Sequence, residues 1–347
     1  PWPHLAALSQ ATARQNKILV ERLAVYPEYI FDGETWLDVA FRSEILRRVD
    51  SDGLARTDNW SPGMGEGNPL PIPMIAPELG ASLELNDILA RGDKGYDLTE
   101  REIIRLFAAR SGEVDEIASV ANNIRQRVNG DAVSYVVNRN INYTNVCYFG
   151  CKFCAFSKGK THEALRGKPY DLAMGEIIRR AEEAWDRGAT EVCLQGGIHP
   201  DYTGETYLEI LRAIKSALPE IHVHAFTPLE VFQGAKTLDL PLDTYLGILR
   251  DEGLGTLPGT AAEILDDEVR ATLCPDKINT NQWLEVMEKA HGLGLRSTAT
   301  IMFGHIERPV NWARHLLRLR DLQRRTNGFS ELVPLPFVHM EAPIYLK

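Results

Sequence analysis

The pattern of apolar and polar residues changes near residue 132. Before it, apolar positions recur at helical spacing, and the last helical run ends at Asn129-Gly130. After it, short apolar runs alternate with amphipathic helical patterns, and these runs cover residues 133–142, 190–195, 221–226, 255–257, 295–302 and 329–335. Alternation of this kind predicts parallel strands joined by crossover helices. We therefore expect an α/β fold, a partial TIM-type (β/α)6 barrel preceded by a helical collar and an N-terminal segment.

Changes in composition divide the chain into four segments. Residues 1–57 carry apolar positions but no chemical motif, and residues 58–82 are rich in Gly, Pro, Asn and Ser, which is typical of a linker. Residues 83–131 are predicted to form the helical collar, in which Thr99-Glu-Arg-Glu102 is a capping box. Residues 132–347 are predicted to form the barrel.

Two acidic features of the barrel are predicted to lie at helix N-termini. Asp171 precedes an amphipathic run that stops at Gly188, and we expect it to cap that helix. Asp266-Asp-Glu268 precedes another helix, where negative charge is favourable. This second feature is interpreted as a helix start rather than as a metal site.

Composition limits the class of protein. The chain has 347 residues, a net charge of −10 and no cluster of Lys and Arg, so neither nucleic acid nor an anionic membrane surface is an expected partner. No apolar run is long enough to span a membrane. Five cysteines do not make a disulfide framework, and a cytoplasmic or organelle-matrix location is expected. The chain begins at Pro1 without a readable targeting segment, and we expect it to be a fragment.

Three of the five cysteines, Cys147, Cys151 and Cys154, lie in one short segment directly after the first predicted strand. Asn145 before them and Gly150 among them favour a loop over a helix. Three thiolates from one loop suit a soft metal centre, and an iron–sulfur cubane with three cysteine ligands leaves one iron open. A zinc loop is the alternative, although zinc normally takes a fourth Cys or His nearby. Active sites of barrel enzymes gather at the C-terminal ends of the strands, where this loop is predicted to lie.

Other candidate residues also follow predicted strands. Gln195-Gly-Gly197 comes after the second strand, where adjacent glycines allow a ligand to approach the backbone closely. His222 and His224 alternate on the third strand and face one side, and hydrogen-bonded interior histidines are favoured over a catalytic or metal-binding role. Glu230, beyond that strand, is a candidate for holding ribose hydroxyls or the substrate.

Further candidates carry weaker signals. His305 and His339 follow the fifth and sixth strands and are candidates for substrate contact, although lone histidines are more often packing residues. Gly259 lies in a Gly/Pro turn after the fourth strand. Cys193 is expected to be a buried small hydrophobe within the second strand, and Cys274 has no evident partner.

The motif Cys147-x-x-x-Cys151-x-x-Cys154, with an aromatic residue at Phe153, resembles the signature of the radical S-adenosylmethionine (SAM) superfamily. The resemblance implies a [4Fe-4S] cluster held by the three cysteines, with SAM chelating the open iron. It also implies that Gly196 and Gly197, with Gln195 before them, contact the amino group of SAM. The turn that contains Gly259 resembles a segment that supports the adenine, one residue out of register at its glutamate.

Longer stretches narrow the resemblance to the FO synthase family, in the half that uses tyrosine. The stretches are Asn138–Cys147, Glu191–His199, His222–Phe226 and Pro258–Asp267, and the similarity extends from about Leu83 to the C-terminus. It implies coupling of the 4-hydroxybenzyl group of L-tyrosine to 5-amino-6-(D-ribitylamino)uracil, in coenzyme F420 biosynthesis. An electron donor such as ferredoxin or flavodoxin is then required.

Two departures and two alternatives accompany this resemblance. Residues 1–57 resemble, more loosely, the tail of the companion cyclase half of fused chains, so that half is an expected partner in a longer chain. The family continues with further helices beyond the point where residue 347 lies. The alternatives are an aminofutalosine-synthase-like enzyme, which shares the barrel but uses another radical acceptor, and a zinc-binding module without catalysis.

Overall fold

Six parallel strands form one curled sheet in the larger part of the chain. The structure is a computed structural model that describes residues 5–15, 17, 19, 23–49, 53–55, 84–156, 169–338 and 342–345. The strands are β1 (Asn138–Asn142), β2 (Glu191–Gln195), β3 (His222–Ala225), β4 (Thr256–Leu257), β5 (Arg296–Phe303) and β6 (Phe329–Pro336). Each pairs with its neighbour in the sequence, in the order β1-β2-β3-β4-β5-β6. The predicted partial barrel is confirmed.

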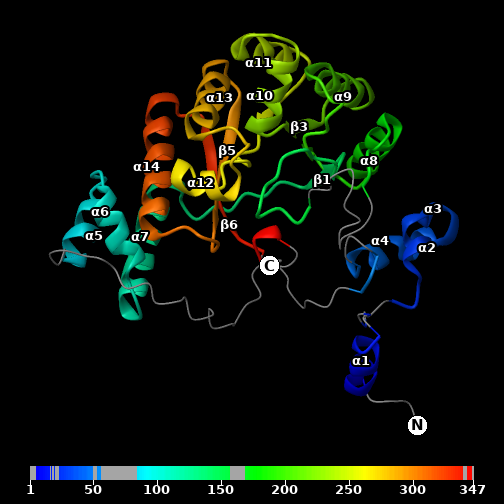
Figure 1. The fold of residues 1–347 in the computed structure, drawn as a ribbon, viewed down its shortest axis with the longest axis horizontal. Helices are drawn as coiled ribbons and strands as arrows, with labels where there is room; N and C mark the ends of the chain where they lie inside the picture. Colours follow the sequence, from blue (N-terminus) through cyan, green and yellow to red (C-terminus); the bar gives the residue numbers. More distant parts are fainter. Residues whose placement is uncertain are drawn as a thin grey trace. The chain divides into compact units, whose positions relative to one another are not determined.

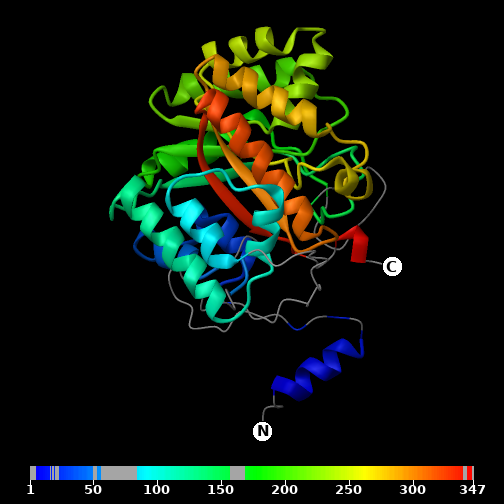
Figure 2. The same ribbon diagram turned by 90° about the vertical axis from the view of Figure 1, so that its left-hand side faces the viewer.

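Helices cover the convex face of this sheet, as Figures 1 and 2 show. They are α8 (Met174–Asp186), α9 (Gly204–Ala217), α10 (Pro228–Thr237), α11 (Leu242–Asp251), α13 (Thr280–Gly292) and α14 (Pro309–Thr326). The short helix α12 (Asp267–Leu273) lies instead at the C-terminal ends of the strands. The strand residues that face these helices are apolar and buried, among them Ile141, Val192, Leu194, Val223 and Leu257. The residues between them therefore face the concave side, because side chains alternate along a strand.

Three helices precede the sheet, α5 (Leu85–Asp93), α6 (Glu100–Phe107) and α7 (Gly112–Asn129). The predicted capping box is present at the start of α6: the Glu102 backbone N–H donates to Thr99 Oγ1, and Glu102 Oε2 accepts from the Thr99 backbone N–H. Ion pairs tie this collar to α14, since Arg314 Nε lies 3.2 Å from Glu100 Oε2. The collar thus packs against the last barrel helix.

The chain divides into two compact units, residues 1–76 and 77–347. The first contains α1 (Leu5–Ala13), α2 (Pro27–Phe31), α3 (Gly33–Trp36) and α4 (Val39–Arg47). The four-segment division of the sequence remains a prediction, and the predicted linker, 58–82, lies outside the described residues. In the part of the chain that the structure describes, no helix is long and apolar enough to cross a membrane.

Two local predictions were wrong. The first strand begins at Asn138 rather than at residue 133, and Val133 and Tyr135 are 91% and 85% exposed, because no neighbouring strand pairs with that segment. Asp171 does not cap α8, whose N-cap is Ala173. Asp171 instead pairs with Thr144 and accepts a hydrogen bond from the Tyr202 hydroxyl. The predicted role of Asp266 was correct, since it is the N-cap of α12.

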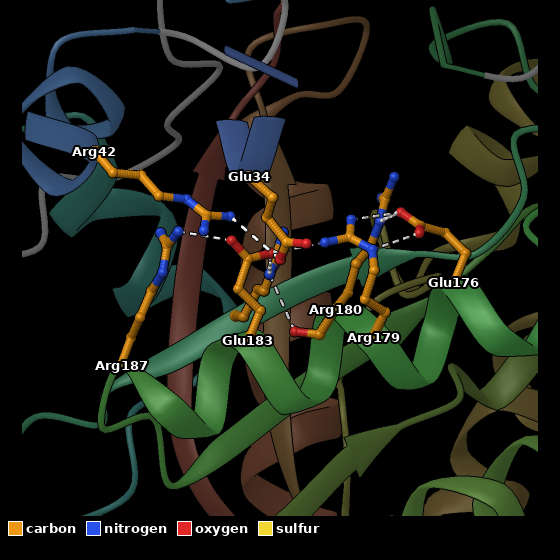
Figure 3. A network of polar contacts seen from close by, with 8 residues as sticks. Glu34, Arg42, Glu176, Arg179, Arg180, Glu183 and Arg187 are labelled. Atoms are coloured by element: carbon orange, nitrogen blue, oxygen red, sulfur yellow. Dashed lines mark hydrogen bonds and ion pairs between the residues drawn. The ribbon is translucent and has the colours of Figure 1, made fainter. Parts of the chain in front are cut away.

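Helix α8 carries a chain of ion pairs on its polar side (Figure 3). Within the helix, Glu176 binds Arg179 and Arg180 at 2.8 and 2.7 Å, and Glu183 binds Arg187, the C-cap residue, at 2.6 Å. Glu183 also lies 2.8 Å from Nη1 of Arg139 on β1. Exposed pairs one turn apart contribute little stability, so the pair with Arg139 is the one that ties the helix to the sheet.

Stability is expected to fall in mild acid because two buried histidines are uncharged. His291 on α13 has hydroxyl partners at both ring nitrogens, and the Leu265 backbone N–H donates to Nδ1 of His315 on α14 at 2.9 Å. Burial lowers the pKa of His291 to about 4 and that of His315 to about 3.

In the unfolded chain histidine has a pKa of about 6.5, so between that pH and the lower pKa of the folded state the unfolded chain binds more protons. Over this pH range each histidine lowers the free energy of unfolding by about 1.4 kcal/mol per pH unit as the pH falls. Urea unfolding at pH 7.5 and 5.5 measures this loss. His315→Gln should be less stable than the natural protein at pH 7.5 but should lose less on acidification. An equal loss in both proteins would contradict the assignment.

Candidate active site

The three cysteines lie on the loop that leaves the C-terminal end of β1. Two polar side chains fix the start of this loop: the Thr144 hydroxyl donates to the Tyr170 carbonyl at 2.8 Å, and Asn145 Oδ1 accepts from the Tyr170 N–H at 2.8 Å. All three thiols are partly exposed. Their position at a strand end is the one predicted.

The donor set fits an iron–sulfur cluster, in which each cysteine ligates a different iron. Cysteines that ligate different irons of a cluster lie further apart than the ligands of a single metal ion. Among the described residues, no three His, Cys, Asp or Glu side chains converge closely enough to hold one metal ion. The assignment of Cys147, Cys151 and Cys154 as cluster ligands stays a prediction.

The segment that follows α12 holds the loop from the other side. The Gly150 backbone N–H donates to Asp276 Oδ2 at 2.8 Å, and the Lys152 N–H donates to the Leu273 carbonyl at 2.8 Å. These bonds place backbone donors of the cysteine loop against a fixed helix end. Asp276 carries no sequence signal, because it is far from the loop in the chain.

A buried ion pair lies beside the loop, and the sequence analysis missed its lysine. Nζ of Lys277 is 2.7 Å from Glu263 Oε1, and the two side chains are only 7% and 11% exposed. Nζ also lies 5.4 Å from the centre of the Phe153 ring. Burial would lower the pKa of Lys277, but the Glu263 carboxylate and the nearby thiols raise it above its ordinary value. Burial raises the pKa of the Cys151 thiol, and Lys277 opposes that shift.

Gly196 and Gly197 pack against the same loop. A Cβ at Gly197 would overlap the Val146 carbonyl, and one at Gly196 would overlap the Tyr143 ring. The Gly197 N–H donates to the Thr144 carbonyl at 2.8 Å. Glycine is needed at 197 because two backbones meet closely and at 196 because the Tyr143 ring fills the space, whether or not a ligand binds.

Replacement of Gly197 by alanine is expected to push the cysteine loop away from β2. Overpacking of this kind costs about 1–3 kcal/mol, and iron uptake during reconstitution should fall with it. Gly175→Ala is the matched control, since a Cβ there meets open space at the start of α8. Thermal unfolding and iron content measure both effects. Full iron uptake in Gly197→Ala would show that the loop tolerates the displacement.

Glu230 is placed differently from the prediction. It is fully buried, and its carboxylate accepts hydrogen bonds from the Tyr143 hydroxyl and from the backbone N–H groups of Gly196 (3.1 Å) and Thr227 (2.7 Å). It joins the ends of β1, β2 and β3 and has no surface to offer a ribose or a substrate. Burial raises the pKa of Glu230, and its donors oppose that shift. Its role in the structure is to hold the Gly196-Gly197 turn.

The histidine candidates separate into two kinds. His222 Nε2 and His224 Nδ1 lie 2.8 and 2.7 Å from the hydroxyl of Thr256, so both are hydrogen-bonded side chains of the concave face. The side chain of His305 is fully buried, with Nδ1 2.7 Å from Glu307 Oε2 and Nε2 3.1 Å from the Met302 carbonyl, which leaves no ring nitrogen for a substrate. His339 lies outside the described residues.

The remaining candidates have internal partners. Gln195 Oε1 accepts from the Thr260 hydroxyl at 3.0 Å, which joins the ends of β2 and β4. The Gly259 N–H donates to Thr298 Oγ1 at 2.8 Å, and a Cβ at Gly259 would overlap the backbone of β5. The prediction that Cys193 is buried was wrong: it is only partly buried and faces the concave side, because it lies at an inward position of β2.

Comparison with known proteins places the chain in a family. A model of the radical SAM superfamily matches residues 141–319. The FO synthase of Streptomyces coelicolor is 39% identical over 388 residues, which cover 100% of this chain and 44% of that protein. The FO synthase of Mycobacterium tuberculosis H37Rv is 38% identical over 397 residues, with 45% of its length covered. The chain thus spans less than half the length of these relatives.

A shorter relative is matched over most of its length. The 5-amino-6-(D-ribitylamino)uracil–L-tyrosine 4-hydroxyphenyl transferase of Methanocaldococcus jannaschii is 45% identical over 252 residues, 72% of this chain and 69% of that protein. Two solved structures share the fold at 19% identity. Methylornithine synthase has a TM-score of 0.56 and covers 75% of this chain and 71% of its own. The hydrogenase maturase HydG of Carboxydothermus hydrogenoformans has a TM-score of 0.57, with 76% and 58% covered.

The radical SAM superfamily generally uses a [4Fe-4S] cluster and SAM. The matched region contains the cysteine loop, the Gly196-Gly197 turn and the Lys277–Glu263 pair. This chain belongs to the radical SAM superfamily and, within it, to the family of the 5-amino-6-(D-ribitylamino)uracil–L-tyrosine 4-hydroxyphenyl transferases.

Proposed function

We propose that this chain is the tyrosine-using part of an FO synthase, a radical SAM transferase that couples the 4-hydroxybenzyl group of L-tyrosine to 5-amino-6-(D-ribitylamino)uracil. The observation that carries the proposal is the 45% identity to the Methanocaldococcus jannaschii transferase, which extends over most of both chains. The cysteine loop at the C-terminal end of β1 supports it, because that is the active end of a barrel.

The residues take distinct parts in this proposal. Cys147, Cys151 and Cys154 hold a [4Fe-4S] cluster, and the Gly196-Gly197 turn presents backbone groups to the amino group of SAM. When bound, the cluster and SAM would supply the radical chemistry. Phe153 packs beside the cluster, while Gln195 and Gly259 line the strand ends nearest to SAM. Glu230 does not contact SAM but fixes the position of the Gly196-Gly197 turn through its hydrogen bond to the Gly196 N–H.

The partners follow from the same proposal. A cluster held at this site would require a low-potential one-electron donor, such as ferredoxin or flavodoxin. The whole of this chain matches only 44% of the Streptomyces coelicolor FO synthase, which supports a cyclase half in the same longer chain, with residues 1–57 as its tail and residues 58–82 as the linker. The radical reaction would require water and oxygen to be excluded from the concave face during turnover.

Anaerobic turnover tests the proposal. The reconstituted full-length protein is given SAM, L-tyrosine, the ribityl uracil and a chemical reductant, and the products are analysed by mass spectrometry. A coupled product that requires tyrosine and carries its ring label supports the proposal. Formation of 5′-deoxyadenosine without tyrosine-dependent coupling would favour another radical acceptor. Colourless protein that holds one zinc ion would exclude radical chemistry.

A further inference from the structure

The concave face of β1 to β4 is polar, unlike the interior of a closed eight-stranded barrel. Barrel interiors are normally filled by bulky branched side chains. Here the residues that alternate with the buried apolar ones carry hydrogen-bonding side chains, apart from Cys193 of β2, which lies level with Asn140 and His224. We define the polar inner face as Asn138, Asn140, Glu191, His222, His224 and Thr256.

The strand register brings these side chains into two rows. Asn140 and His224 lie level with Thr256, and Asn138 and Glu191 lie level with His222. The row that contains Asn140, His224 and Thr256 lies two residues before Gln195 along the strands, which places it about 7 Å beneath the active end of the barrel. A molecule that reacts at the mouth can therefore extend a chain of roughly that length down to the rows.

Some donors and acceptors of the polar inner face form no hydrogen bond with one another and can bind a ligand. The Thr256 hydroxyl, with one proton, lies between the two imidazoles at 2.8 and 2.7 Å. Each imidazole engages it through one ring nitrogen, so the second nitrogen of His224 has no hydrogen bond among the described residues. Burial lowers the pKa of His224, which favours the neutral ring that can donate at one nitrogen and accept at the other. The Asn138 amide donates to Glu191 at 3.2 Å.

The chemistry of this face selects one of the two substrates. Hydroxyl, amide and neutral imidazole groups each donate and accept, and the Glu191 carboxyl group accepts, which matches the hydroxyls of a polyol. The amino-acid end of tyrosine carries a carboxylate, and β1 to β4 present no Lys or Arg on this face. An aromatic ring gains little from a hydrogen-bonding surface. Resting on the proposed function, we infer that the polar inner face binds the ribityl chain of 5-amino-6-(D-ribitylamino)uracil, with Thr256 and His224 as the residues that select it.

Binding measured without turnover tests this inference. The reconstituted protein with SAM is titrated with the ribityl uracil and with 5,6-diaminouracil, which has the same ring but lacks the ribityl chain. The natural protein should bind the ribityl compound at least tenfold more tightly. Thr256→Val and His224→Phe should each weaken binding of the ribityl compound by about tenfold, the effect of one lost hydrogen bond, and should change binding of 5,6-diaminouracil by less than about twofold.

A control separates recognition from structural damage. Val223→Ala lies on the same strand but faces the core, and a general disturbance from it should affect both uracils alike. The inference is overturned if Thr256→Val weakens both uracils equally, if it weakens neither, or if it instead weakens tyrosine. The proposed function fails separately, when the ribityl compound binds as expected but no tyrosine-dependent coupling follows.

Discussion

Replacement of Cys151 by alanine is expected to abolish cluster binding and SAM cleavage together. Its side chain packs against apolar residues of the barrel, which fix its position, and it remains partly exposed, so its thiol can serve as a metal ligand. With two cysteines left on the loop, the cubane loses one of its three protein ligands. Iron and sulfide analysis after anaerobic reconstitution should give less than about a tenth of the natural content, since second-shell losses alone already cost 10–100-fold in affinity. Formation of 5′-deoxyadenosine should fall below detection.

Cys274→Ala is the matched control, because Cys274 is a buried thiol outside the cysteine loop. It should keep both the cluster and SAM cleavage. Circular dichroism verifies that each variant is folded. A full complement of iron and sulfide in folded Cys151→Ala would refute the ligand assignment, and an equal loss in the control would show that the effect is not specific to the loop.

The second large effect is expected from Lys277→Met, which should destabilise the protein by about 3–5 kcal/mol. The substitution leaves the Glu263 carboxylate with no cation in a site where its side chain is only 11% exposed. A buried charge without a partner is costly, whereas removing both charges costs much less. Urea unfolding of the cluster-free protein at pH 7.5 measures the loss.

Two comparisons make this result specific. The double variant Lys277→Met with Glu263→Gln should recover a large part of the lost stability. Arg325→Met removes an exposed pair, in which Arg325 lies 3.0 Å from Glu288, and should cost less than about 1 kcal/mol. If Lys277→Met lowers the free energy of unfolding no more than Arg325→Met does, the Lys277–Glu263 pair does not stabilise the structure beside the cysteine loop.

The site combines groups that the chain keeps far apart. The cysteine loop follows β1, the glycine turn follows β2, and the lysine that contacts Phe153 precedes α13. Barrel closure brings their strand ends to one edge. The candidates nearest to that edge, Gln195 and Gly259, have partners on neighbouring strands, so they also hold the barrel together.

Local pattern was enough for the strands and for the chemical class. Alternating runs predicted that six strands exist, because period-two and period-3.6 patterns reflect which side of each element is buried, although β1 begins at Asn138 rather than at residue 133. Three cysteines within eight residues predicted a soft-metal loop, since three thiols so close in sequence come from one short segment. The capping box at Thr99 was also readable, because both of its partners lie within one turn.

Tertiary structure alone decided what the other polar residues do. Glu230 stood beyond a strand end like a ligand-binding residue, but three donors from separate strand ends enclose it. Lys277 had no signal, because its partner Glu263 is 14 residues away and meets it only after α12 is placed. The two histidines of β3 are hydrogen-bonded to Thr256, which lies 32 and 34 residues later in the chain, so only the fold shows their partner. The sequence therefore determined the fold and the cysteine loop through short-range spacing, while long-range packing determined which polar groups are enclosed and which face the concave side.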